Sequence, residues 1–270
     1  MIVKKLCLGI AAILASIATP GLAADMPVKA PAPVVSPEYD WSGVYAGASL
    51  GWMRSTYDWR YTNPAVLFGF LAVGCCSFKS ASVTDGLIGG HIGAQWQWSH
   101  IVVGIEFAAN APWWDVKANG GTCLDQTVPV ICQVRPQAIE MFGGRLGYAW
   151  SNLLIYGDGG GARSSVVSNL NSGTLNQPVN ADDDNTLATY RGWYAGAGVE
   201  YVLMKGGVFD LIGGLEYQHI DLGTQTHLSP LVPAFSPCPP GNDCRAITAK
   251  DSLVRVRLSV KLNPFASPHP

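Results

Sequence analysis

Residues 193–201 read WYAGAGVEY, and every second residue from Trp193 to Tyr201 is apolar. The residues between them are Tyr194, two glycines and Glu200. Alternate side chains of a β-strand point to opposite faces, so this stretch has one apolar face that ends in aromatic residues and one small, polar face. The same alternation recurs along the chain, which is typical of a β-barrel with a lipid-facing exterior and a polar interior.

The N-terminal residues predict an export signal. Lys4 and Lys5 form a positive n-region, and Leu6–Ile17 forms a short apolar h-region. Gly21-Leu22-Ala23 then places small residues at positions −3 and −1, so we expect residues 1–23 to be removed as a signal peptide, with cleavage after Ala24 as the alternative. The apolar stretch is too short to act as a membrane-spanning anchor. Residues 24–40 are rich in proline and predict an extended periplasmic lead-in that acts as a linker.

The composition agrees with an outer-membrane location. Charged residues make up 13% of the chain, whereas soluble domains carry about 25%. The mature sequence has no apolar run near 18 residues, which excludes a helical membrane protein. A membrane protein without spanning helices must close its sheet into a barrel, because an open edge in lipid leaves backbone groups unpaired. Without Lys4 and Lys5, 15 of the 17 basic residues remain against 19 acidic ones, so nothing indicates a nucleic-acid partner.

Eight segments alternate in this way, and short and long connections alternate strictly between them. The segments are residues 41–52, 86–98, 101–109, 139–150, 153–163, 193–201, 208–222 and 251–262. The short connections are residues 99–100, 151–152 and 205–207, and the long ones are 53–84, 110–138, 164–190 and 223–250. We therefore predict an all-β fold: an eight-stranded antiparallel transmembrane β-barrel over residues 41–265, with short periplasmic turns, four long extracellular loops and a tail of residues 266–270.

Several stretches together resemble one family, the outer-membrane surface antigens of alphaproteobacteria, often labelled porin-like. This family is related to the transmembrane domain of outer membrane protein A. The stretches are ADMPVKAP (24–31), WSGVYAGASLGW (41–52), GGRLGYAWSNLLIYGDGGGA (143–162), GWYAGAGVEYVL (192–203) and VRVRLSVKL (254–262). The resemblance implies an eight-stranded barrel with a structural and surface-antigen role, and some members are reported as porins or haem binders. Members usually end at an aromatic residue that the barrel-assembly machinery reads, whereas here Leu262 is followed by residues 263–270, where Phe265 could serve instead.

Inward-facing charges form the candidate site. They comprise four acids and four bases: Glu106, Asp158, Glu200, Glu216, Arg145, Arg255, Arg257 and Lys261. Such a set could line an ion pathway. The interior of an eight-stranded barrel is only wide enough for side chains, however, and buried charges persist when they are paired, so we favour a structural salt-bridge network.

Six cysteines remain in the mature chain, and all are expected in the long loops. They are Cys75, Cys76, Cys123, Cys132, Cys238 and Cys244. An even number in an exported protein indicates disulfides, and the simplest local pairs are Cys123–Cys132 and Cys238–Cys244. Cys75 and Cys76 are adjacent and would be strained if paired together, so a cross-loop bridge or a free thiol stays open for them.

These observations predict a non-enzymatic protein of the bacterial outer membrane with a structural, surface-exposed role. A small porin for ions or small solutes is the alternative. A haem-binding barrel or one that modifies outer-leaflet lipid is weaker, because the five histidines show no metal spacing and His219 has no expected serine on its face. We expect no cofactor or metal. The expected partners are outer-membrane lipid, the barrel-assembly machinery through the last strand, and a host or environmental ligand at the loops.

Overall fold

The computed structural model describes residues 39–61, 79–114, 118–124, 130–172, 186–227 and 245–262. The chain divides into a unit of residues Met1–Pro37 and a unit of residues Glu38–Pro270, and every described residue belongs to the second unit. The expected signal peptide, most of the lead-in and Phe265 lie outside the described residues. Among the described residues, no helix is long and apolar enough to cross a membrane.

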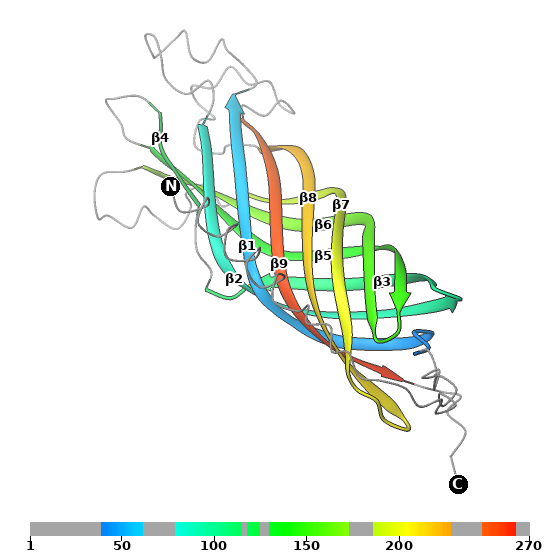
Figure 1. Ribbon diagram of the computed structural model, residues 1–270. Helices are drawn as coiled ribbons and strands as arrows, with labels where there is room; N and C mark the ends of the chain where they lie inside the picture. The colour runs from blue at the N-terminus through cyan, green and yellow to red at the C-terminus, as the bar shows by residue number, and fades with distance from the viewer. Residues whose placement is uncertain are drawn as a thin grey trace, which may run out of the picture. The chain divides into compact units, whose positions relative to one another are not determined.

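The described residues form nine β-strands (Figure 1). They are β1 Gly43–Tyr61, β2 Lys79–Trp98, β3 Ile101–Pro112, β4 Ala118–Leu124, β5 Val130–Trp150, β6 Leu153–Ser172, β7 Thr186–Met204, β8 Phe209–His227 and β9 Arg245–Leu262.

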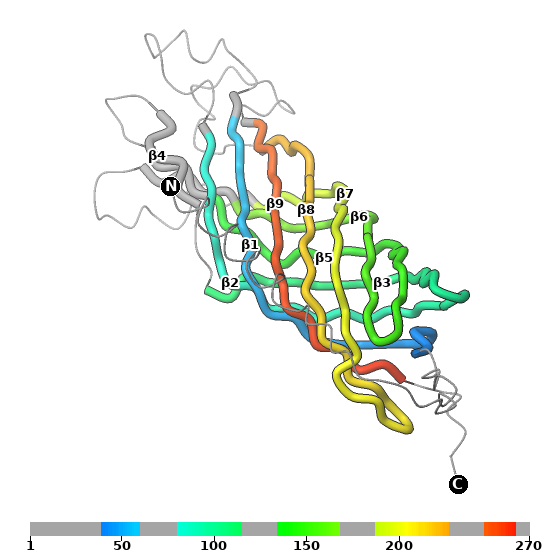
Figure 2. The backbone as a smooth tube through the Cα atoms, in the orientation of Figure 1, coloured from blue at the N-terminus to red at the C-terminus, as the bar shows by residue number. Residues whose placement is uncertain are grey.

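Eight of these strands close into an antiparallel ring. Each pairs with its neighbour along the chain, and two further pairings, β1 with β9 and β3 with β5, close the circle. In Figure 2 the blue β1 accordingly lies between the cyan β2 and the red β9. This arrangement confirms the predicted eight-stranded antiparallel barrel.

The remaining strand, β4, lies within residues 110–138, which the sequence predicted to be a loop. Among the described strands, β4 pairs with the first part of β5 alone, where Ala118 lies opposite Val134 and Leu124 opposite Val130. The pairing contains two register shifts. Such short, irregular pairing carries no sustained alternation, which explains why the sequence pattern did not reveal it.

The three short connections occur where the sequence predicted them, the third being one residue longer than expected, and they define one end of the barrel, called here the turn end. Ser99–His100 and Ser151–Asn152 form tight turns, and β7 and β8 are joined by residues 205–208. Ser99 and Ser151 adopt φ values of 54° and 53°. Mirror-image hairpin turns require such positive φ values because they match the right-handed twist of the strands. The opposite end, where the long connections begin, is called the loop end.

The strands are longer than the sequence predicted at the loop end, and the chemistry of their two faces reverses there. In β1, the outward residues from Val44 to Trp52 are apolar, but the next outward residues are Arg54, Thr56 and Asp58. The inward residues change in the opposite sense, from Gly47 and Ser49 to Met53, Tyr57 and Trp59. The direction of the side chains therefore continues unchanged while the apolar face moves from the outside to the inside.

The same reversal occurs in β9. Its outward residues are apolar from Leu262 back to Val254 and polar at Ser252 and Lys250, while Leu253 and Ile247 point inward and are buried. The lipid-facing lengths, Val44–Trp52 and Val254–Leu262, each match the roughly 9–11 residues of a transmembrane strand. Because the outward residues of these 19- and 18-residue strands become polar beyond this length, we infer that the remainder extends beyond the bilayer.

We call this extension the collar. It comprises the loop-end parts of β1, β2, β5, β6, β7, β8 and β9 beyond Trp52, Gly86, Phe142, Gly161, Trp193, Tyr217 and Val254. The collar is organised like a water-soluble barrel, with mostly polar residues outside and an apolar core that includes Met53, Tyr57, Trp59, Ile139, Tyr190 and Ile247. The exposed Leu187 is an exception on the outside. Long loops were predicted for residues 53–84, 110–138, 164–190 and 223–250; these boundaries are wrong because strand pairing continues into all four ranges.

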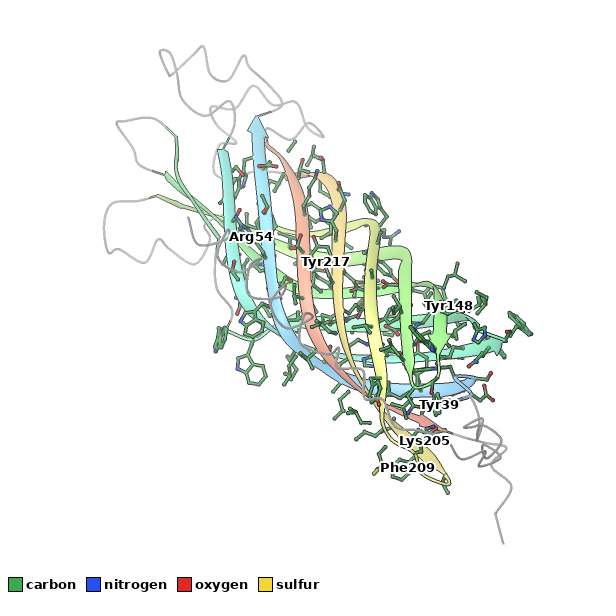
Figure 3. All side chains as sticks on the ribbon, viewed as in Figure 1. Tyr39, Arg54, Tyr148, Lys205, Phe209 and Tyr217 are labelled. Carbon is green, nitrogen blue, oxygen red and sulfur yellow. The ribbon has the colours of Figure 1, made fainter. Side chains whose placement is uncertain are left out.

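The interior is layered along its axis as a result. A small apolar cluster, which includes Tyr39, Trp41, Val102, Leu154, Val202 and Ile212, fills the turn end. The inward charges of β3, β5, β7, β8 and β9 occupy the middle, and the collar core fills the loop end. Figure 3 shows Tyr39 and Lys205 at the turn end and Arg54 toward the loop end.

Candidate functional site

The candidate site is a cluster of three arginines and three glutamates in the middle of the lumen. Alternation places one or two of them on the inward face of each of five strands: Glu106 on β3, Arg145 on β5, Glu200 on β7, Glu216 on β8, and Arg255 and Arg257 on β9. Inward glycines make room for them. A Cβ atom at Gly104 would lie 3.1 Å from Cγ of Arg145, and one at Gly198 would lie 2.5 Å from the ring of Tyr156, which packs against Arg145.

Arg257 is the centre of the cluster. Its Nη2 lies 2.6 Å from Oε2 of Glu106, and its Nη1 lies 2.8 Å from Oε2 of Glu216. Its Nε lies 3.7 Å from Oε1 of Glu200. Because these carboxylates come from three different strands, Arg257 links β9 to β3, β7 and β8 through the lumen.

Arg145 supports the cluster from the opposite wall. Its Nη2 donates to Glu200 at 2.9 Å, and its Nη1 donates to the hydroxyl of Tyr45 at the same distance. Tyr45 in turn donates to Glu106 at 2.8 Å. The guanidinium carbon also lies 3.9 Å from the centre of the Tyr156 ring, within range of a cation–π contact.

Arg255 completes the cluster toward the loop end. Its Nε donates to Glu216 at 2.7 Å, and its Nη1 donates to the side-chain oxygen of Asn110 at 2.8 Å. Arg255 is fully buried, and Glu216 is 2% exposed. Three positive and three negative side chains thus balance in a region from which bulk water is excluded, and removal of any one would leave an uncompensated buried charge.

Asp158 and Lys261, which the sequence grouped with these charges, have no ion pair with the cluster in the described part of the chain. Asp158 accepts a hydrogen bond from the amide of Gln218, which also donates to Glu216 at 3.1 Å, so it is joined only through an amide. Lys261 lies at the turn end, where it is 3.6 Å from Asp210 and donates to the backbone carbonyls of Asp40 and Ser42.

Sequence reasoning missed the group that closes the turn end. Trp41 is completely buried, its backbone N–H donates to Oε1 of Gln97 at 2.7 Å, and its backbone carbonyl accepts from the Gln95 amide at 2.7 Å. Tyr39 donates to Asp210 at 2.7 Å and lies under the Lys261 ammonium. Burial, followed by this hydrogen bond, raises the pKa of the Tyr39 phenol above its ordinary value.

Tyr39 and Asp40 thus belong to the barrel mouth, although the sequence placed residues 24–40 in a linker. The signal that could have found them is the pair of aromatic residues directly before the first alternating strand.

The histidines form two serine contacts. Nε2 of His91 lies 2.7 Å from Oγ of Ser259 inside the lumen. His219 faces outward, with Nδ1 3.4 Å from Oγ of Ser252 on the neighbouring strand β9. The expectation that His219 has no serine on its face is therefore wrong, because strand pairing brings in a residue that is distant in sequence.

Two of the cysteines lie in strands that the structure describes. Cys123 lies in β4 and Cys132 in β5, so the expectation that both occupy loops is wrong. Thr122 pairs with Ile131, which places the two cysteines on neighbouring strands of one hairpin. Cys75, Cys76, Cys238 and Cys244 lie outside the described residues.

Comparison with known proteins identifies the family. The family model described as outer membrane protein beta-barrel domain matches residues 10–249. The chain belongs to this family and is an outer-membrane protein. It is 30% identical over 225 residues to the 31 kDa outer-membrane immunogenic protein of Brucella melitensis biotype 1, a match that covers 79% of this chain and 86% of the relative. It is 28% identical over 198 residues to the 25 kDa outer-membrane immunogenic protein of Brucella abortus biovar 1, with 73% of each chain covered.

Solved structures with detectable similarity include the outer membrane protein OprG from Pseudomonas aeruginosa, with a TM-score of 0.40, 12% identity, and coverage of 82% of this chain and 97% of that one. Neisserial surface protein A gives a TM-score of 0.31 and 11% identity, with 82% and 98% covered.

Proposed function

We propose that this protein is a sealed, non-enzymatic barrel that supports the outer membrane and carries its collar and loops above the membrane surface. The observation that supports this proposal is the layered interior, in which the paired charges around Arg257 lie between the turn-end cluster and the collar core. A pathway for ions would have to cross both apolar layers. In addition, each of the six charges of the central cluster is already engaged by an opposite charge at 2.6–3.8 Å.

The surface role is supported by the collar and by the relatives. Polar outward residues such as Arg54, Thr56 and Asp58 suit a wall that stands in water, so the chain is displayed beyond the lipid. The two Brucella relatives are both described as immunogenic outer-membrane proteins, which agrees with a surface that is accessible from outside.

Planar-bilayer recording of the full chain tests the sealed lumen. We expect no stable single-channel conductance from the wild type. A variant that adds Tyr57→Ala and Trp59→Ala of the collar core to Trp41→Ala, Glu106→Ala and Arg257→Ala weakens all three layers, and it should raise the frequency of open events. Gel mobility with and without heating verifies that this variant is folded. Stable, ion-selective conductance of the wild type would contradict the proposal and favour the small porin.

The enzymatic alternative centres on His219 and Ser252, since a hydrolase of outer-leaflet lipid needs a serine, a histidine and an acid. Asp221, the acid on the same face of β8, is engaged by Lys250 at 3.4 Å and by the N–H of Gly223 at 2.9 Å. We therefore expect no ester hydrolysis with a fluorogenic diacyl phospholipid. Hydrolysis by the wild type that is lost in Ser252→Ala would overturn the non-enzymatic assignment.

A further inference from the structure

The outer surface of the barrel carries an apolar groove of about 570 Å³. Its volume lies within the roughly 300–1,000 Å³ range of small-molecule sites. The groove is lined on the lipid-facing side by Leu50, Trp52, Trp113, Trp114, Val256 and Leu258. Because these side chains point outward from the wall, the groove opens toward the hydrocarbon, although the inward-pointing residues Ser49, Leu87 and Arg257 also border it.

One wall of the groove is held in place by the backbone after β3. The N–H of Trp113 donates to the carbonyl of Gly86 at 2.8 Å, and the N–H of Trp114 donates to the carboxylate of Asp85 at 3.1 Å. The ring of Trp114 then covers Gly86, where an added Cβ atom would lie only 2.6 Å from the ring. The Trp114 ring can pack against β2 at this position only because residue 86 is a glycine.

The loop end of the groove meets a positive charge. Arg54 follows Trp52 on the same outward face of β1, roughly 7 Å further along at the rise of a β-strand. Its cross-strand neighbours are Thr84 on β2 and Ser252 on β9, which supply hydroxyl groups in the same row. Arg54 is exposed and has no ion pair among the residues that the structure describes, whereas Lys250 is paired with Asp221.

The apolar groove and the adjacent Arg54 guanidinium are together complementary to an amphiphile that has an acyl chain and a phosphate. Since the short turns of such barrels face the periplasm, the loop end faces the outer leaflet. We propose that the groove binds one acyl chain of a phosphate-bearing lipid of the outer leaflet and that Arg54 holds its phosphate. Arginine suits this role because its planar fork matches phosphate geometry.

Native mass spectrometry of the full chain in detergent, titrated with dioleoyl phosphatidic acid, tests the proposal. Arg54→Gln should raise the apparent Kd of the first lipid by about tenfold, which corresponds to about 1.4 kcal/mol. Arg191→Gln is the matched control, because Arg191 is exposed on β7 two residues from Trp193, just as Arg54 is two residues from Trp52, and neither Arg191 nor Trp193 lines the groove. Dioleoylglycerol should bind more weakly than phosphatidic acid to the wild type, and inorganic phosphate should not compete.

The apolar part has its own pair of variants. Gly86→Leu should displace the Trp114 ring and raise the Kd by a similar factor, whereas Gly161→Leu should leave it unchanged, since an added Cβ atom at Gly161 meets nothing within 4 Å. Heat-modified gel mobility verifies that each variant is folded.

Equal effects of the two arginine variants, equal effects of the two glycine variants, or equal binding of the neutral lipid would each overturn the proposal. So would a dimer that is lost in Gly86→Leu while lipid binding persists, because a second copy would then be the occupant. Conductance does not enter this test, so its outcome is independent of whether the lumen is sealed.

Discussion

Arg257 of β9 and Glu106 of β3 lie 2.6 Å apart across the lumen, although β1 and β2 separate their strands in the wall. The ladder hydrogen bonds join only adjacent strands, so this pair provides a link that the wall itself cannot. Glu216, Glu200 and Arg145 extend the link to three more strands. The charged middle layer therefore works as an internal brace of the barrel.

Arg145 and Glu200 should be energetically coupled. Each single change to alanine leaves a buried charge without its partner and should lower the free energy of unfolding by about 3–5 kcal/mol. The double variant should lose clearly less than the sum of the single losses, as measured by urea unfolding in a double-mutant cycle. The exposed pair Arg163 and Glu140, whose side chains are more than half exposed at a separation of 4.0 Å, is the control and should show at most about 1 kcal/mol. Strict additivity at Arg145 and Glu200 would show that the brace is not cooperative.

The position of the membrane boundary can be tested on a single strand. Ile92 lies on the lipid face of β2, so Ile92→Arg should cost about 2–4 kcal/mol of folding free energy in lipid bilayers. Ser80 points outward from the collar part of the same strand, opposite Asp58, so Ser80→Arg should change stability by no more than about 0.5 kcal/mol. Comparable losses at both positions would mean that the collar is also embedded in lipid.

Tyr39→Phe should isolate the hydroxyl at the turn end, because phenylalanine keeps the ring beneath Lys261. Loss of the hydrogen bond to buried Asp210 should cost about 1–3 kcal/mol near neutral pH. The folded pKa of Tyr39 is raised above the unfolded value of 10.0, so the hydroxyl's contribution is complete below pH 10 and falls as the pH rises further. The stability difference between wild type and Tyr39→Phe, measured by urea titration from pH 7 to 11, should therefore shrink above pH 10. A constant difference would argue against a protonated, buried phenol.

The cysteine prediction concerns oxidised protein isolated from the envelope. We expect at least two disulfides, with Cys123–Cys132 and Cys238–Cys244 as the foremost pairs. The ring closes without β4, so reduction should leave the heat-modified gel mobility of the barrel unchanged while protease resistance of the β4–β5 hairpin falls. Thiol labelling of denatured, unreduced protein decides whether bridges exist, and six reactive thiols in the mature chain would rule them out.

The lipid-facing half of the fold could be predicted from the sequence because one rule governs it, the alternation of apolar outward residues with small or polar inward ones. The alternation from Val254 to Leu262 places apolar residues in lipid and Arg255 and Arg257 inside, and the structure retains both assignments. The same rule failed at Met53, since beyond Trp52 the solvent outside the wall changes from lipid to water and the apolar residues move inward. A pattern based on apolar-outward residues therefore ends at the membrane surface, even though the strand continues.

The sequence carries less information on which of the inward charges lie together. That Lys261 points inward follows from alternation, but its height is nearer the turn end than that of Arg257, and its partner Asp210 belongs to a hairpin whose register only pairing determines. Likewise, Ser252 meets His219 through the register of β8 and β9, and no local motif encodes that contact.

The collar also affects how the protein is inserted into the outer membrane and how it is retained there. During insertion, the outward charges of the collar have to cross the hydrocarbon layer in which the lipid-facing parts of the strands finally lie. These charges include Arg54, Arg163, Arg191 and Lys250. Spontaneous insertion from the periplasm therefore has a high free-energy barrier, which insertion catalysed by the barrel-assembly machinery would lower. Once the collar has crossed the membrane, the same free-energy barrier opposes its return. The polar exterior of the collar therefore keeps the barrel in the membrane.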